Sequence, residues 1–182
     1  MKKLLVVLEM QNDFVTGPLG SEAAKAIVPL VVRKIQRRRR QGYDIAYVFA
    51  VSDGGSDRPA SVFQKSFQLV PEIAATVQPS DHKIIHDAEH ATQLNVFLST
   101  KNYKSVELVG ALTDARTFMT ARSLKYVLPH IKVRIDAACC VGDTSDKTFW
   151  LMRKNAEIRI THLRKKKFYS SIKNYELYML KE

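Results

Sequence analysis

The sequence has few of the features that point to a secreted or membrane protein. It contains only two cysteines in 182 residues, adjacent at Cys139 and Cys140. Neighbouring cysteines rarely form a disulfide because the geometry is strained, so we expect buried, reduced thiols. No apolar run approaches the roughly 20 residues of a membrane span, and the first run ends at Glu9 without the small-residue cleavage pattern of an export signal. We therefore expect a cytoplasmic protein.

Acidic residues are also scarce. There are 18 Asp and Glu against 29 Lys and Arg, a formal net charge of +11, which favours encounter with acidic partners. Neither basic cluster has the glycine and aromatic interleaving of a nucleic-acid motif, so we expect solvated faces and keep nucleic-acid binding as the weaker alternative. The clusters are Arg33, Lys34, Arg37, Arg38, Arg39 and Arg40, and Arg164, Lys165, Lys166 and Lys167.

Short β-rich apolar runs alternate with longer segments of helical period. Strands that are separated by helices predict right-handed crossovers and one parallel sheet. The expected fold class is α/β, a three-layer Rossmann-like open sheet of six parallel strands with helices on both faces. The strands are expected at 4–8, 45–51, 83–86, 105–109, 131–135 and 157–160, and the helices at 21–41, 70–77, 91–99, 113–128 and 144–155.

The first long helix carries clear start and stop signals. Ser21 is expected to cap its amino end, Gly42 to end it, and Pro29 to kink it. Its predicted core face is Ala24, Ile27, Val28, Val31, Val32 and Ile35. Residues 52–66 hold two glycines, a proline and few apolar residues, so we expect a loop that crosses the strand ends.

The stretch 106–121 predicts a strand that turns sharply at Gly110 and enters a helix near Asp114. Such a turn presents the first helical residues above the carboxyl edge of a parallel sheet, where the helix dipole favours negative charge. The side chain at the position of a nucleophile is Arg116. A protonated guanidinium can bind an anion but cannot attack a carbonyl.

Three stretches carry a resemblance to a known family. They are LVVLEMQNDFVTGPLG at 5–20, VGALTDAR at 109–116 and IDAACC at 135–140. In this order they closely resemble the isochorismatase-like cysteine hydrolases, the group that includes nicotinamidases and related amidases. The resemblance covers about residues 1–161 and implies an isochorismatase-like domain at 1–162, assembled as a homodimer or larger homo-oligomer.

The resemblance also implies a set of catalytic positions. The family uses an Asp that activates a Cys and a Lys that supports the charge. It also has an oxyanion hole at the sharp turn after the strand, here called the elbow, where a cis peptide usually precedes the residue matching Leu112. This sequence has Glu9, Asp87 and Arg116 at the three side-chain positions. The matching ligand-binding positions are Phe14, Asp53, Leu112 and Thr113.

The same resemblance suggests where a metal would bind. Nicotinamidases use an Asp and two His, and Asp53 fits the first position, but Gly55 stands at the next and residues 63–67 contain no His. His82, His86 and His90 are spaced by four, yet a strand at 83–86 would not gather them as a helix would. We predict no metal and no other cofactor.

Three interpretations of the replaced side chains remain open. Glu9, Asp87 and Arg116 can pair with one another and close the old site. Alternatively, Arg116 can hold a small anionic ligand. Third, Glu9 can act as a general acid, as the Asp does in the isochorismatase branch of the family, which also lacks the Cys. The first two predict a pseudoenzyme acting in binding, assembly or regulation, and the third a nucleophile-free hydrolase.

The carboxyl end, 163–182, extends beyond the resemblance. It is basic but also holds many large apolar groups, which a disordered tail would not be expected to carry. We predict that residues 172–180 pack on the domain or on a second subunit, while residues 164–167 stay solvated. The apolar groups are Phe168, Ile172, Tyr175, Leu177, Tyr178, Met179 and Leu180.

Overall fold

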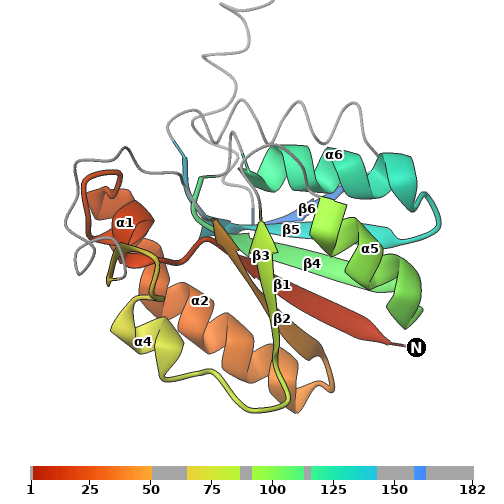
Figure 1. Cartoon of the computed structure of the whole chain (residues 1–182), viewed down its shortest axis with the longest axis horizontal. Coiled ribbons are helices and arrows are strands. Elements are labelled where there is room, and N and C mark those ends of the chain that lie inside the picture. Colours follow the sequence, from red (N-terminus) through yellow and green to blue (C-terminus); the bar gives the residue numbers. More distant parts are fainter. Residues whose placement is uncertain (1, 51–64, 87–91, 113–115, 143–157, 163–182) are drawn as a thin grey trace, which may run out of the picture.

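The computed structural model of the chain describes residues 2–50, 65–86, 92–112, 116–142 and 158–162. They form a parallel sheet of six strands with helices on both faces, as the sequence predicts (Figure 1). The strands are β1 (Lys3–Leu8), β2 (Asp44–Ala50), β3 (His82–His86), β4 (Ser105–Gly110), β5 (Lys132–Cys140) and β6 (Arg159–Thr161). Within these described ranges, no helix is long and apolar enough to cross a membrane.

The order of the strands creates a switch point at the centre of the sheet. The order is β3-β2-β1-β4-β5-β6, so the chain builds outward from β1 on one side and from β4 on the other. β1 and β4 are parallel neighbours, with Lys3 opposite Ser105 and Leu8 opposite Gly110. Because successive crossovers leave in opposite directions here, the carboxyl ends of β1 and β4 flank the place where open α/β sheets bind ligands.

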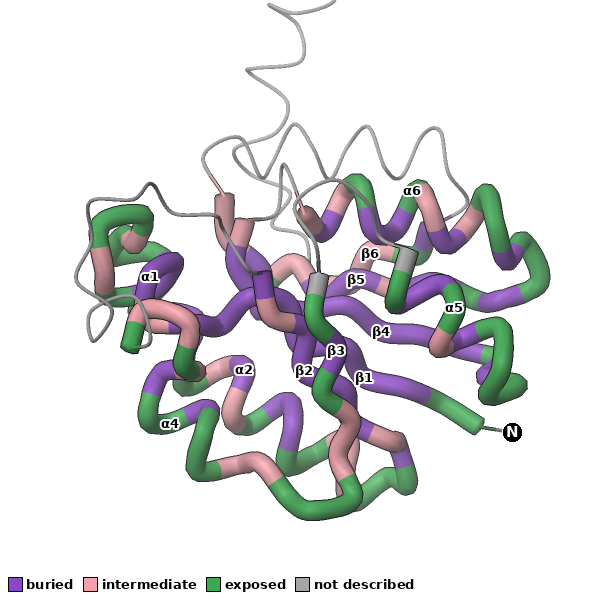
Figure 2. Tube along the Cα trace, in the orientation of Figure 1, coloured by how far each residue is buried: buried purple, intermediate pink, exposed green. Residues whose placement is uncertain are grey.

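Helices enclose the sheet in two layers, and each layer buries its own apolar cluster (Figures 1 and 2). The helices are α1 (Asn12–Val15), α2 (Glu22–Arg40) and α4 (Pro71–Ala74) on one face, and α5 (Thr92–Lys101) and α6 (Phe118–Val127) on the other. β1 is apolar on both sides: Leu5 and Val7 face α2, whereas Leu4 and Val6 face the opposite cluster. A strand buried on both faces explains why its sequence is a continuous apolar run.

The start and stop of α2 follow the predicted signals. The Ser21 side chain accepts a hydrogen bond from the Ala24 N–H at 3.1 Å, which satisfies a donor that the first turn leaves open. Gly42 follows the helix with φ of +72°, a conformation that costs glycine little. Pro29 lies within the helix, which continues past it to Arg40. The predicted core face is buried, except that Val32 is half-buried and Lys34 is also enclosed.

Several predicted boundaries were wrong. No helix was expected between the strand at 4–8 and the helix at 21–41, but α1 forms there, and the Asn12 side chain donates to the Lys65 carbonyl at 2.9 Å. β5 was expected to end at residue 135 and continues to Cys140. Leu108 of β4 lies opposite Ile135 of β5, and the next pair is Gly110 with Cys140. The register therefore shifts between these two pairs, as it does at a β-bulge. α4 is shorter than the expected helix at 70–77.

The sequence predicted that the basic cluster on α2 is a solvated face. This prediction holds for only part of the cluster. Three of its members contact acids: Lys34 contacts Glu107 and Asp136, Arg38 contacts Glu107, and Arg39 contacts Asp81. Side chains of Lys34, Glu107 and Asp136 are almost fully buried, so this network ties α2 to β4 and β5. The part of the cluster left exposed consists of Arg33, Arg37 and Arg40.

Candidate functional site

The sharp turn after β4 depends on a glycine. Gly110 has φ of +135°, and a Cβ built on it would lie 2.0 Å from the Leu8 carbonyl oxygen. That oxygen accepts the Ala111 N–H at 3.1 Å, so the chain crosses directly against the end of β1. A side chain at this position would collide with backbone that cannot move without breaking the β1–β4 pairing. The turn therefore brings the segment after β4 onto the end of β1.

Glu9 lies at this crossing. It follows β1, its N–H donates to the Val48 carbonyl at 2.9 Å, and its backbone has φ of +51°. The side chain has no exposed surface. A non-glycine residue with positive φ costs about 1 kcal/mol or more and persists only where its surroundings enforce it. The β1, β2 and β4 ends thus hold a carboxyl group inside the switch point.

Arg116 meets Glu9 from the other side of the crossing. Its Nε lies 3.2 Å from Glu9 Oε1, and the side chain is 24% exposed. The backbone N–H of Arg116 donates to the Leu112 carbonyl at 2.8 Å, and the backbone N–H of Thr117 points to the same oxygen at 3.4 Å. Arg116 and Thr117 thus form a widened, π-type turn before α6, a geometry that often occurs at functional sites. Asp87 and Asp114 lie outside the described residues.

The ion pair leaves the Glu9 carboxylate poorly solvated. Among the described residues, neither carboxylate oxygen of Glu9 accepts a hydrogen bond. Burial raises its pKa to about 7, against the opposing effect of the Arg116 guanidinium, which favours the charged form. Near neutral pH this group can therefore gain or lose a proton, and the state it adopts depends on the position of Arg116.

The expected ligand-binding positions are only partly described. Phe14 lies on α1 and is 6% exposed, packed into the apolar cluster that faces α2. Leu112 is half-buried against the same cluster and has φ of +55°. Asp53 and Thr113 lie outside the described residues. The part of the chain that the structure describes contains no cis peptide bond, so the peptide before Leu112 differs from the family pattern.

Gln11 has a structural role that no sequence pattern predicted. This side chain is fully buried and donates to the carbonyls of Ala50 and Phe67, at 3.1 and 3.0 Å, while its oxygen accepts the Ala50 N–H at 2.8 Å. Gln11 thereby fixes the carboxyl end of β2 and the segment after residue 64 against β1. A glutamine beside a strand has no sequence pattern that distinguishes this role from a surface position.

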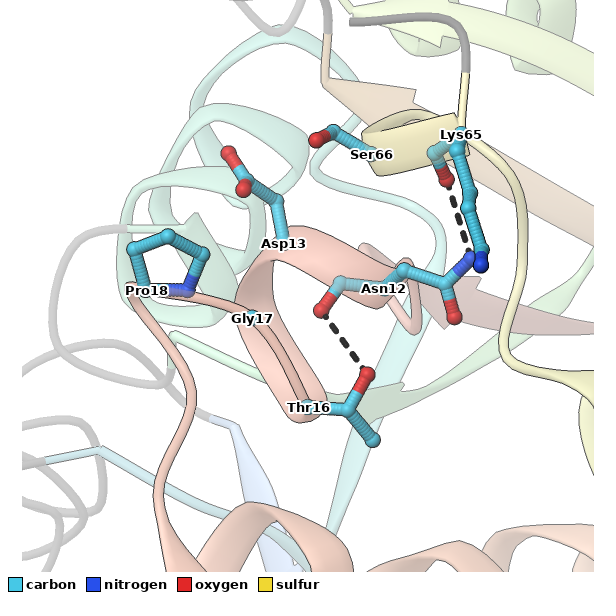
Figure 3. A pocket seen from close by; sticks show the side chains of 7 residues that line it. All are labelled: Asn12, Asp13, Thr16, Gly17, Pro18, Lys65 and Ser66. Atoms are coloured by element: carbon cyan, nitrogen blue, oxygen red, sulfur yellow. Dashed lines mark hydrogen bonds between the residues drawn. The ribbon is translucent and has the colours of Figure 1, made fainter. Parts of the chain in front are cut away.

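A shallow pocket opens beside α1, the helix that follows Glu9 in the chain. It has a volume of about 450 Å³. Figure 3 shows the α1 side chains on one side and Ser66 and Lys65 on the other, with the Asn12 amide bonded to the Lys65 carbonyl. The lining residues are Asn12, Asp13, Thr16, Gly17, Pro18, Lys65 and Ser66. It lies on the side of the sheet covered by α2 and does not include Glu9 or Arg116.

Both cysteines are free and buried, as expected. They lie on opposite faces of β5, with Cys139 in the cluster facing α2 and Cys140 in the other. Burial raises the pKa of Cys139 to about 12 and the pKa of Cys140 further. Neither can supply a thiolate at neutral pH, because the thiolate is the form that burial disfavours.

The described residues also do not assemble a metal site. No three His, Cys, Asp or Glu side chains among them lie together as a metal would require. The His82 ring packs against Phe97 with their centroids 4.7 Å apart, which is a structural contact. Asp53 and His90 fall outside the described part of the chain. The donors within the described residues therefore do not fit a metal, and we assign no step of chemistry to one.

Comparison with known proteins found a family model and solved structures of the same fold. The isochorismatase domain model matches residues 3–154. Solved structures with the same fold include an N-carbamoylsarcosine amidase from Thermoplasma acidophilum, with a TM-score of 0.74 and 20% identity over 88% of this chain and 96% of that one. No curated protein matched in sequence.

Two further structures are similar. A pyrazinamidase/nicotinamidase from Streptococcus mutans UA159 has a TM-score of 0.75 and 17% identity, over 88% of this chain and 100% of that one. A pyrazinamidase of Pyrococcus horikoshii, in complex with zinc, has a TM-score of 0.72 and 17% identity, over 88% of this chain and 99% of that one. At these identities the likeness establishes the fold alone.

Proposed function

The chain belongs to the isochorismatase family, and from that premise we propose that it has lost cysteine-amidase chemistry and acts as a pseudoenzyme in binding, assembly or regulation. The observation that carries the proposal is the contact between Arg116 and Glu9. From the family resemblance, a thiol beside an activating acid is expected at the end of the elbow. In this chain the Arg116 guanidinium contacts the Glu9 carboxylate there instead. Glu9 therefore has no nucleophile to deprotonate, and a covalent acyl intermediate cannot form.

Neither the two cysteines nor Thr117, the hydroxyl next to Arg116, can take over the role. A nucleophile of this kind must be deprotonated near neutral pH or lie against a base. The two cysteines of the chain are buried in β5, with pKa values raised by burial. Thr117 has a fully buried hydroxyl that makes no hydrogen bond to the described residues, so no base activates it there.

A panel of small amides, including nicotinamide and N-carbamoyl amino acids, tests the proposal. We expect ammonia release no faster than without protein. The triple variant Glu9→Asp, Asp87→Lys and Arg116→Cys asks whether only the side chains were lost. Its matched control keeps Glu9→Asp and Asp87→Lys but leaves Arg116 in place. Hydrolysis by the unaltered chain that Glu9→Gln abolishes would refute the proposal.

A second candidate is a nucleophile-free hydrolase with Glu9 as general acid. The pKa of Glu9, raised to about 7, favours it, because an acid works best when its pKa lies near the operating pH. The ion pair with Arg116 opposes it, because the paired carboxylate holds no proton to give. Turnover of enol ethers that carry a carboxylate, lost in Glu9→Gln, would favour this candidate over the first.

Assembly and location belong to the proposal as well. We expect a homodimer or larger homo-oligomer in the cytoplasm. In support, α6 exposes apolar side chains: Met119 is 55% exposed, Val127 50% and Tyr126 88%. Sedimentation velocity should give at least twice the monomer mass, and Tyr126→Lys should lower it if α6 forms the contact. A monomer at micromolar concentration would remove assembly from the proposal.

A further inference from the structure

We propose that the Arg116 guanidinium binds a small organic carboxylate in place of the Glu9 carboxylate, while Glu9 takes up one proton from solvent. The inference rests on the proposed function in one respect: the ligand is bound and released unchanged. No bond of the ligand is made or broken. One anion and one proton enter together, so the net charge of the site does not change.

The first support is the chemistry of the group that already occupies the guanidinium. Glu9 Oε1 lies 3.2 Å from Arg116 Nε, so the site holds a carboxylate supplied by the chain itself. A guanidinium offers paired N–H donors in a plane that matches a carboxylate. A ligand of the same chemistry can form the same contact, whereas a neutral amide of equal shape lacks the charge.

The second support is the difference in access between the two partners. Glu9 has no exposed surface, whereas the Arg116 side chain is 24% exposed. A ligand arriving from solvent therefore meets the guanidinium before it meets the acid. The Arg116 backbone lies in the widened turn before α6, where its N–H and that of Thr117 both point to the Leu112 carbonyl oxygen, so a ligand at this position is held by the guanidinium and not by these amides.

The third support is what happens to Glu9 once Arg116 turns to the ligand. Neither Glu9 oxygen accepts a hydrogen bond from the described residues, and Arg116 is the charged group that acts on it there. Among the described residues, the strand ends next to it, at Leu8, Val48 and Gly110, offer no charge. A buried carboxylate that loses its counter-ion is costly, and the group neutralises by binding a proton.

The exchange makes binding depend on pH in a defined direction. In the free site the pKa of Glu9 is about 7. In the bound site it must be higher, because the charge that favoured ionisation is now shared with the ligand. Above pH 7 each binding event therefore takes up close to one proton, and affinity falls roughly tenfold per pH unit. Below pH 6 Glu9 is already protonated, and the affinity levels off.

Titration calorimetry with benzoate tests the proposal, and benzamide serves as the neutral probe of the same shape. We expect millimolar or tighter binding of benzoate at pH 6, weaker binding at pH 8, and none of benzamide at either. At pH 8, two buffers with different ionisation enthalpies should report the uptake of about one proton per benzoate bound. This count uses the unaltered chain, so it does not depend on whether a variant folds.

Substitutions separate the two partners. Arg116→Gln should abolish benzoate binding, whereas Arg122→Gln, which removes an exposed arginine from the same helix, should leave it unchanged. Glu9→Gln should bind benzoate at least as tightly at pH 8 as at pH 6, with no proton uptake. Glu72→Gln, at an exposed glutamate on α4, should retain the pH dependence of the unaltered chain.

The outcomes distinguish this inference from the proposed function. Absence of benzoate binding at both pH values, or equal binding of benzamide, overturns the carboxylate site and leaves the loss of amidase activity intact. Binding without proton uptake at pH 8 overturns the exchange with Glu9. Hydrolysis of amides by the unaltered chain overturns the proposed function, whatever benzoate does.

Discussion

The substitution Glu9→Gln should make the protein more stable at alkaline pH than the unaltered chain. Glu9 is fully buried, and its pKa rises from 4.5, the ordinary value, to about 7 in the folded state. The folded state therefore keeps a proton that the unfolded chain loses. Stability from this proton is fully present below pH 4.5 and is lost as the pH rises through 7. Glutamine has the same shape and does not titrate.

The size of the effect follows from the shift. A difference of about 2.5 in pKa, at about 1.36 kcal/mol per unit, corresponds to about 3 kcal/mol between pH 4 and pH 8. In a domain of this length that equals a change in melting temperature of roughly 10 °C. The absolute stability of both proteins changes with pH through many groups, but those changes cancel in the difference between them.

Urea unfolding at a series of pH values measures this difference. Relative to the unaltered chain, the variant should gain about 3 kcal/mol from pH 4 to pH 8, with an unchanged dependence on urea. Glu72→Gln, at an exposed site on α4, should show no such trend. If the difference between Glu9→Gln and the unaltered chain stays constant with pH, Glu9 does not titrate as a buried acid and the reasoning fails.

Three further predictions concern the structure around the site. Gly110→Ala should lower the free energy of unfolding by more than about 3 kcal/mol or prevent folding. Gly42→Ala, at a position with positive φ but open space around it, should lower it by about 1 kcal/mol. Urea unfolding measures both. Lys34→Met should lower the free energy of unfolding by about 3–5 kcal/mol, because it removes the ammonium between two buried carboxylates and leaves Glu107 with Arg38 and Asp136 with the His162 ring. A smaller loss would show that Arg38 and His162 suffice. Cys139 should react with a thiol reagent only on unfolding; rapid reaction in the native state would contradict its burial.

The sequence predicted the fold well because the signals of the sheet are local. Continuous apolar runs identified the buried parallel strands, and Ser21 and Gly42 identified the two ends of α2. The sharp turn at Gly110 was also predicted, and the structure adds its cause, the close approach of the Leu8 carbonyl. Such features depend on residues near one another in the chain, so a pattern can report them.

The parts that the sequence missed depend on distant residues. Lys34 looked like part of a solvated basic run, but acids on β4 and β5, far along the chain, enclose it. No helix was expected at residues 12–15, but α1 forms there, and its Asn12 side chain bonds to the carbonyl of Lys65, far along the chain. The pairing of Glu9 with Arg116 could be inferred only because a family resemblance placed both at one site; spacing alone does not bring residues 107 positions apart into contact.

The pKa of Glu9, read from the NMR shift of its ¹³C-labelled carboxyl group, tests the central claim most directly. That claim is that a guanidinium, in place of a nucleophile, holds a buried acid at the elbow. The account predicts a pKa of about 7 in the unaltered chain, a higher value in Arg116→Gln, and no change in Arg122→Gln. A pKa near 4.5 in both the unaltered chain and Arg116→Gln would contradict it, because Glu9 would then be neither buried nor paired with Arg116.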